Sequence, residues 1–109
     1  MDIVNILKVE EAFGKARKCP EQSINSWVAH MKSLASQLKE MSEEVAQHSI
    51  AQRILNRVGK EYRSTKASLR SVRRLMVDMV SQQLEAVELE MIEEAEEERA
   101  KALPMRNSL

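Results

Sequence analysis

Apolar residues recur at every third or fourth position along most of this 109-residue chain, and few residues interrupt the pattern. The sequence holds only two glycines and two prolines, which would break helices. It also has only three aromatic residues, a residue type that favours β-strands. A spacing of three or four places these apolar side chains on one face of an α-helix. The sequence therefore predicts an all-α protein.

The first half of the chain contains the strongest helical pattern. A first helix is expected over residues 2–18, and Pro20 separates it from the next. The second helix is expected over residues 23–41, where the hydroxyl of Ser23 serves as the N-cap. Trp27 falls inside the broad apolar stripe of this helix, so we expect it in the core.

The second half predicts shorter helices followed by a long one. Helices are expected over residues 45–58 and 62–72, with Gly59 between them in a conformation of positive φ. A break is expected within residues 70–74, and the last helix starts near Leu75. These elements predict a compact bundle of four to five helices with a long C-terminal helix.

Length and charge divide the chain further. A chain of this size supports one hydrophobic core, which we place in a helical domain over residues 23–92, after an N-terminal helix and linker at 1–22. An acidic helix extension and tail follow at 93–109. Residues 1–83 carry 14 basic and 9 acidic side chains, a net charge of +5, whereas residues 84–109 carry 3 and 8, a net charge of −5. This asymmetry favours head-to-tail attraction or docking within the chain.

Groups that support catalysis are sparse. The chain has one cysteine and two histidines, without a glycine-rich phosphate loop or closely spaced metal ligands. Cys19 is expected to be a half-buried spacer, and it excludes an internal disulfide. Glu44 and His48 share a helical face, but two ligands do not complete a metal site, so a surface histidine is favoured. We expect no enzymatic activity, no metal and no cofactor.

The sequence also bears on where the protein is located. No apolar run approaches the length of a membrane span, and residues 1–20 lack the pattern of a signal peptide. A single cysteine gives no support for an oxidising compartment. We therefore expect a cytoplasmic protein with no membrane contact.

A cluster of cations is the first candidate functional site. Residues 53–74 hold eight basic side chains against the single acidic residue Glu61, and their spacing of three and four indicates a common helical side. These residues are expected to contact phosphates in a weak RNA interaction. The alternative is that they keep short helices soluble and meet the acidic tail. The eight are Arg53, Arg57, Lys60, Arg63, Lys66, Arg70, Arg73 and Arg74.

An apolar stripe on the last helix is the second candidate site. Its members repeat every three or four residues and are expected to mediate self-association, as a homo-oligomer of at least two copies, or to bind a helix of a protein partner. Leu89 and Ile92 lie off this edge. The stripe consists of Val77, Val80, Leu84, Val87 and Met91.

Three blocks of sequence carry a resemblance to a known family. Residues 23–41, SINSWVAHMKSLASQLKEM, resemble a Ser-capped helix with the run "lxxLxxqL", and residues 50–69, IAQRILNRVGKEYRSTKASL, resemble "iLngLPxeYxxfvxxl". Residues 75–90, LMVDMVSQQLEAVELE, resemble "LTldeLvsxLlxeE". These patterns, in this order, are similar to those of the capsid-forming Gag polyprotein of copia-type long-terminal-repeat retrotransposons.

The resemblance has implications and departures. It implies a helical domain of the capsid C-terminal type that oligomerises into a shell, or a cellular protein derived from one. Gly59 stands where the family has proline, Thr65 where it has an apolar or aromatic residue, and Met76 where it has threonine. The Cys-rich zinc knuckle of such proteins, their RNA-binding module, is absent from this sequence. Self-assembly is therefore the function we expect, and a helical adaptor is the alternative.

Overall fold

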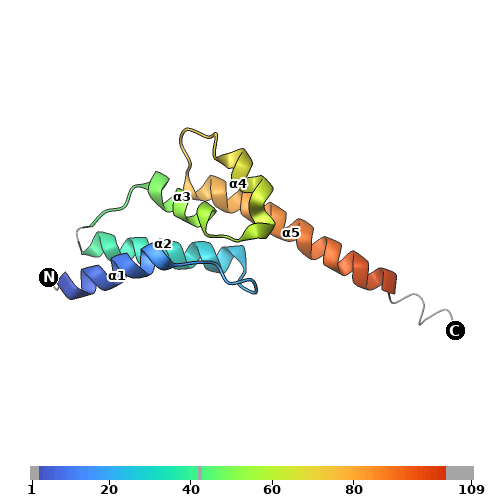
Figure 1. Cartoon of the computed structure of the whole chain (residues 1–109), viewed down its shortest axis with the longest axis horizontal. Helices are drawn as coiled ribbons and strands as arrows, with labels where there is room; N and C mark the ends of the chain where they lie inside the picture. Colours follow the sequence, from blue (N-terminus) through green and yellow to red (C-terminus); the bar gives the residue numbers. More distant parts are fainter. Residues whose placement is uncertain (1–2, 42, 103–109) are drawn as a thin grey trace.

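The computed structural model describes residues 3–41 and 43–102, and in these residues it confirms the all-α prediction (Figure 1). Five α-helices and one short 3₁₀ helix follow each other in the described residues, about 77% of which are helical. The elements, in chain order, are α1 (Ile3–Lys15), α2 (Ile24–Glu40), α3 (Gln47–Asn56), η1 (Lys60–Tyr62), α4 (Arg63–Leu69) and α5 (Val77–Ala102). The long C-terminal helix predicted from the sequence is α5.

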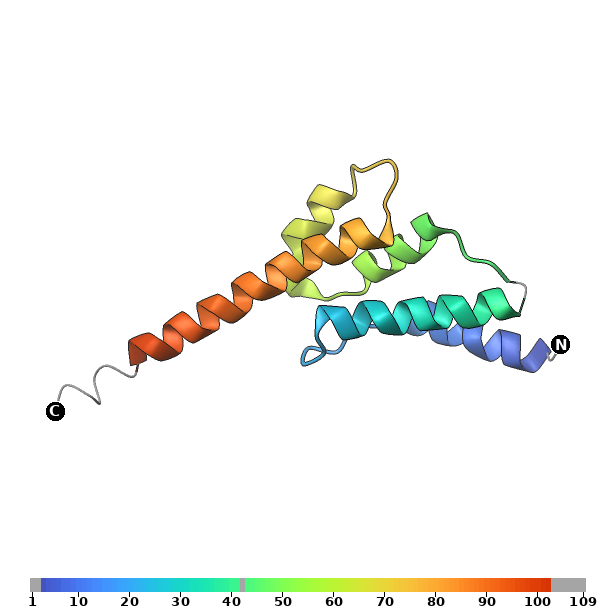
Figure 2. The same ribbon diagram turned by 180° about the vertical axis from the view of Figure 1, so that it is seen from behind.

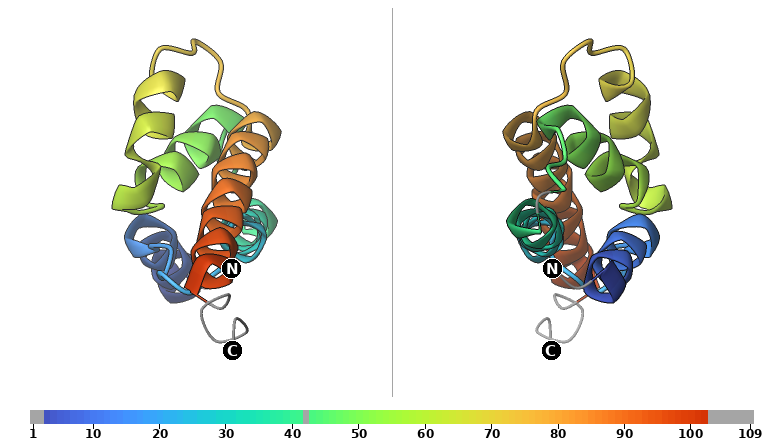
Figure 3. Two further views of the ribbon diagram at one scale, coloured as in Figure 1. Left: turned by 90° about the vertical axis from the view of Figure 1, so that its right-hand side faces the viewer. Right: turned by 90° about the vertical axis from the view of Figure 1, so that its left-hand side faces the viewer.

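Helix α5 contacts α2, α3 and α4 and so links the two sides of the bundle. Helix α1 packs along α2, and α2 in turn contacts α3 (Figure 2). The end-on views show α1 and α2 on one side of the molecule and α3 and α4 on the other, with α5 running across both pairs (Figure 3). The first half of α5 contacts this bundle, whereas its second half extends beyond it (Figure 1).

The core lies where α2, α3 and α5 meet. Its largest member is Trp27, which is fully buried, as its place in the stripe predicted. The indole Nε1 of Trp27 donates a hydrogen bond of 3.1 Å to the backbone carbonyl of Ile54 on α3. A buried indole N–H needs such a partner, and this bond fixes the position of α3 against α2. Phe13 of α1 belongs to the same buried cluster.

The N-terminus of α2 is capped from two sides. Ser23 is the N-cap, as predicted, and its hydroxyl accepts a hydrogen bond of 3.1 Å from the amide of Ser26. The carboxylate of Glu88, 64 positions later on α5, accepts a second bond of 2.8 Å from the amide of Ile24. A carboxylate at a helix N-terminus satisfies a free amide and interacts favourably with the helix dipole. Glu88 therefore links α5 to the start of α2.

The N-terminus of α5 is capped by side chains of α3. The amide of Leu75 donates to Nδ1 of His48 at 3.3 Å, and the amide of Val77 donates to the side-chain oxygen of Gln47 at 3.4 Å. His48 is exposed, as predicted, but no local sequence pattern indicates this long-range contact. Helices α3 and α5 thus begin side by side.

Helix α1 is shorter than the sequence predicted. It ends at Lys15 rather than Lys18, because the amide of Lys18 donates at 3.0 Å to the carbonyl of Arg57 instead of continuing the helix. The loop that follows carries Cys19. The prediction of a half-buried Cys19 was wrong, because its side chain is exposed.

The basic segment does not form one helix. Helix α3 ends at Asn56, and Gly59 has a φ of 118°, so the positive φ expected there is confirmed. Helix α4 ends at Leu69, and the break expected within residues 70–74 is also present. The eight cations are therefore distributed over α3, η1, α4 and the loop before α5.

Two leucines of α5 differ in burial, so substituting them tests how this helix packs against the bundle. Leu84 is fully buried and Leu89 is 56% exposed. We expect Leu84→Ala to lower the free energy of unfolding by about 2 to 5 kcal/mol, because it removes buried methyl groups and leaves a cavity. Leu89→Ala is the control and should change it by less than about 0.5 kcal/mol. Urea titration measures both, and equal effects would contradict this placement of α5.

The two glycines make a second matched pair. Gly59→Ala should lower the free energy of unfolding by about 1 to 3 kcal/mol, because alanine is strained at this φ. Gly14 lies inside α1, where an added Cβ meets nothing closer than 3.8 Å, so Gly14→Ala should stabilise the protein by about 0.5 to 1 kcal/mol. Thermal unfolding followed by circular dichroism separates the two, and a harmless Gly59→Ala would exclude the strained turn.

Candidate protein-interaction site

The apolar stripe predicted as an interface is used inside the chain. Val77, Val80 and Leu84 are at most 2% exposed and belong to the core, while Val87 and Met91 are half-buried against it. The sequence interpretation of this stripe as a surface for self-association or a partner helix is therefore wrong for its buried members. They hold α5 against α2 and α3, so a partner cannot reach them in this conformation.

Other apolar side chains remain exposed at the two ends of the bundle. Ile3 and Leu7 on α1 are 71% and 57% exposed, and Leu89 and Ile92 on α5 are 56% and 48% exposed. Helix α1 begins at one end of the bundle, and the second half of α5 leaves it at the other (Figure 1). Large apolar side chains exposed in this way are candidates for contact with another molecule.

A groove lies beside the exposed part of α5. It has a volume of about 580 Å³ and runs between the loop that joins α1 to α2, η1 and α5. We call it the α5 groove. Its apolar lining comes from Pro20, Tyr62, Met91, Ile92 and Ala95, and its charged lining from Lys18, Glu21, Glu61, Glu88, Glu96 and Arg99.

Tyr62, which lines the α5 groove, is surrounded by charged side chains. Burial, together with the negative charges of Glu88 and Glu61, raises the pKa of Tyr62 to about 12. The ammonium of Lys18 lies 5.7 Å from the centre of the Tyr62 ring, in cation–π contact. Glu88 is already engaged with the amide of Ile24. Tyr62 therefore stays protonated and acts as a structural wall of the groove.

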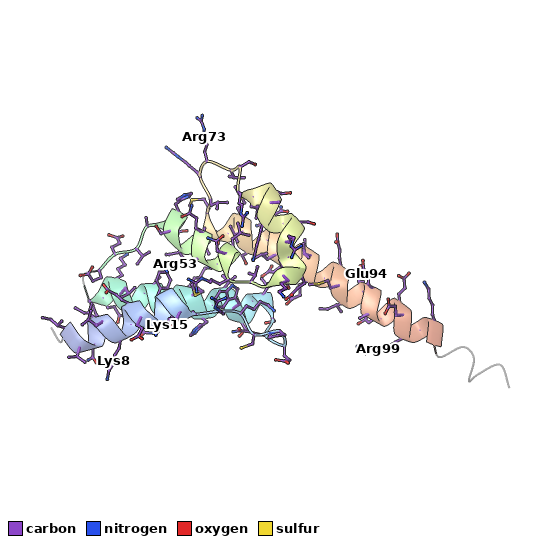
Figure 4. The ribbon with its side chains drawn as sticks, in the orientation of Figure 1. Lys8, Lys15, Arg53, Arg73, Glu94 and Arg99 are labelled. Atoms are coloured by element: carbon purple, nitrogen blue, oxygen red, sulfur yellow. The ribbon has the colours of Figure 1, made fainter. Side chains whose placement is uncertain are left out.

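The predicted phosphate-binding cations do not share one face. The guanidinium of Arg53 lies 4.8 Å from the centre of the Phe13 ring on α1, and Lys66 donates to the carbonyl of Asn56 at 3.4 Å. Arg73 projects from the loop before α5, well away from Arg53, which lies between α3 and α1 (Figure 4). The common helical side inferred from spacing was wrong, because no single helix covers residues 53–74. The exposed cations of this set are Arg53, Lys60, Arg63, Arg70, Arg73 and Arg74.

The acidic run does not meet these cations within the chain. Among the described residues the ion pairs are Lys15 with Glu11 at 2.6 Å and Lys32 with Asp78 at 3.9 Å. Neither joins the acidic run at 93–98 to the basic segment at 53–74. Glu94 lies on the part of α5 that extends away from the bundle (Figure 4). In this conformation, therefore, the basic segment does not pair with the acidic run of its own chain, contrary to the alternative interpretation.

The described residues hold neither a metal-binding cluster nor a membrane-spanning helix. Over residues 3–41 and 43–102, no group of three or more His, Cys, Asp or Glu side chains is arranged to hold a metal ion. Within the same part of the chain, none of the helices has the length and apolarity needed to cross a membrane. The chain matches no protein-family model, no curated protein and no solved structure. The likeness to Gag therefore rests on the three sequence blocks alone.

The raised pKa of Tyr62, the only tyrosine, gives a prediction for stability at high pH. An unfolded tyrosine ionises near pH 10, so the folded state, which holds the proton to about pH 12, loses stability as the pH rises between these values. Chemical unfolding at pH 9 and above measures the loss. Glu88→Gln removes a negative charge and should lower the pKa of Tyr62, followed by phenolate absorbance, whereas Glu85→Gln serves as the control. An unchanged pKa in Glu88→Gln would contradict the assigned cause.

Proposed function

We propose that this chain is a structural self-assembly domain, with copies contacting each other head to tail. The observation that carries the proposal is the separation of opposite charges. The acidic run of α5 extends away from the bundle, while exposed arginines such as Arg63, Arg70 and Arg73 lie on α4 and the loop that follows it. In the described residues no ion pair joins the two regions. Opposite charges that stay apart within one copy attract between copies.

The charge distribution favours head-to-tail contact over a symmetric pair of α5 helices. Two copies paired through the second half of α5 would bring the acidic residues Glu93, Glu94 and Glu97 of one copy near those of the other, and like charges at an interface repel. A head-to-tail contact places this acidic half against the basic side of the next copy. Contacts of this kind build rings, filaments or shells instead of stopping at two copies.

The exposed apolar residues add to the same proposal. Ile3 and Leu7 at one end, and Leu89 at the other, provide apolar surface that association would bury. A shell-forming role agrees with what the resemblance to Gag implies. It requires only weak individual contacts, because an assembly links many of them.

We propose RNA binding as a second function, supported by the exposed cations of the basic segment. Their distribution over several elements fits phosphate contact at several points rather than a single recognition helix. Such binding should be weak and should disappear as salt is raised.

Sedimentation equilibrium tests self-assembly directly. The mean mass of the wild-type chain should rise between about 1 μM and several hundred μM, the range expected for weak interfaces. The rise should be reduced at high salt, because salt screens exposed charges beyond about 10 Å at 0.1 M. The measurement is repeated with nucleic acid removed and with a short RNA added.

Charge reversal identifies the surfaces. One variant combines Arg70→Glu with Arg73→Glu, and the other combines Glu93→Lys with Glu97→Lys. Each alone should remain a monomer, and an equal mixture should associate again, because the reversed charges are complementary. Lys39→Glu on α2 is the matched control and should behave as the wild type.

The possible outcomes separate the proposals. A wild-type monomer over the whole concentration range would contradict self-assembly. If association survives both charge reversals but is lost in Leu7→Ser, the contact between copies is apolar and not electrostatic. Association seen only with RNA would favour the nucleic-acid function.

A further inference from the structure

The α5 groove is an apolar trough with an acidic rim. Met91, Ile92 and Ala95 lie on adjoining turns of α5 and form its floor, with Pro20 opposite on the loop that joins α1 to α2. Ile92 is 48% exposed, so this floor is not covered within the described chain. Apolar surface arranged along one helix in a groove is typical of sites that accept another helix.

The charges around the floor are mostly negative. Glu21, Glu61 and Glu96 line the groove, and none of them has an ion-pair partner among the described residues. Of the two cations that line it, Lys18 is occupied by the Tyr62 ring and by the carbonyl of Cys19, at 3.1 Å. Arg99 lies at the far end. The rim therefore attracts a positively charged ligand.

The length of the groove fits a short helix. It extends along α5 from Glu88 to Arg99. At a rise of 1.5 Å per residue this is about 16 Å, or about three helical turns. A helix of this length offers about three apolar side chains on one face, enough to cover a floor of this size.

We propose that the α5 groove binds a basic amphipathic helix of a partner protein. Apolar side chains spaced by three and four residues cover Met91, Ile92 and Ala95, and flanking Lys or Arg side chains pair with Glu21, Glu61 and Glu96. This surface differs from the end-to-end contacts of the self-assembly proposal, so either proposal can fail while the other stands.

A second copy of the chain fits the groove less well. Helix α1, which has exposed apolar residues, carries Lys8 and Lys15 against Glu10 and Glu11 and has no excess of positive charge, and the exposed half of α5 is acidic. The basic helices α3 and α4 bury their apolar sides, including Ile54 and Leu69, in the core. In the described chain, no helix offers both an open apolar face and a positive charge excess, so the occupant is a different protein.

The test uses two synthetic probes of about 14 residues, four helical turns. One is an amphipathic peptide of Leu and Lys, and the other has Glu in place of every Lys. Fluorescence anisotropy of the labelled peptide gives the Kd, and backbone amide shifts of the protein give the location. The Lys peptide should bind with shifts at residues 20–23, 61–62 and 88–99, and the Glu peptide should not bind.

Matched variants separate the groove from general attraction to acidic helices. Ile92→Ser removes a floor residue and should weaken binding of the Lys peptide by about tenfold, the effect of losing one buried anchor. Leu89→Ser removes a residue of similar exposure outside the groove and should change the Kd by less than about twofold, which is less than the loss of an anchor residue causes. Glu96→Lys on the rim should weaken binding more than Glu97→Lys, which lies off it. Circular dichroism checks that each variant stays folded.

Three results would overturn the proposal. Equal weakening by Ile92→Ser and Leu89→Ser would mean that the peptide binds the acidic helix without using the groove. Shifts confined to residues outside the groove would place the site elsewhere. Groove shifts that depend on protein concentration without peptide would assign the groove to a second copy.

Discussion

The packing of the first half of α5 into the bundle is the contact on which the rest of the structure depends. Val77, Val80 and Leu84 fill the space between α2 and α3. Once they are in place, α5 presents Glu88 to the free amide of Ile24, and α3 presents its own side chains to the start of α5. Apolar burial supplies the stabilisation, and these directional bonds fix how the helices are aligned along each other.

The sequence predicted the helices, but it did not predict the helix ends and caps that depend on residues far away in the chain. Spacing identified the helices around Trp27 and Leu84 because apolar periodicity is a local property. The end of α1 depends on a bond from Lys18 to the carbonyl of Arg57, which lies 39 positions away in the sequence. The cap from Glu88 to Ile24 spans 64 positions. No local pattern contains such information, so these features could be found only from the arrangement in space.

The exposed residues of the candidate interaction site could not be predicted from local sequence either. A stripe such as that of Val77 and Leu84 reveals that a helix buries one side, but it does not reveal whether the cover comes from the same chain or another. Here the chain covers it. Ile92, which lies off the stripe, is instead the residue left open. Its position beside Pro20 and Tyr62 depends on how the α1–α2 loop and η1 fold against α5.

The positions that carry the resemblance to Gag are largely those of the core. Ile54, Val58 and Leu84 match the family patterns and are all at most 1% exposed, so packing of a helical bundle is enough to require apolar residues there. Gly59 departs from the family, and its φ of 118° cannot be adopted by the proline usual at that place. Core positions therefore explain the fold more than the function. The residues that can distinguish assembly from partner binding are the exposed ones on the second half of α5, which contribute least to holding the bundle together.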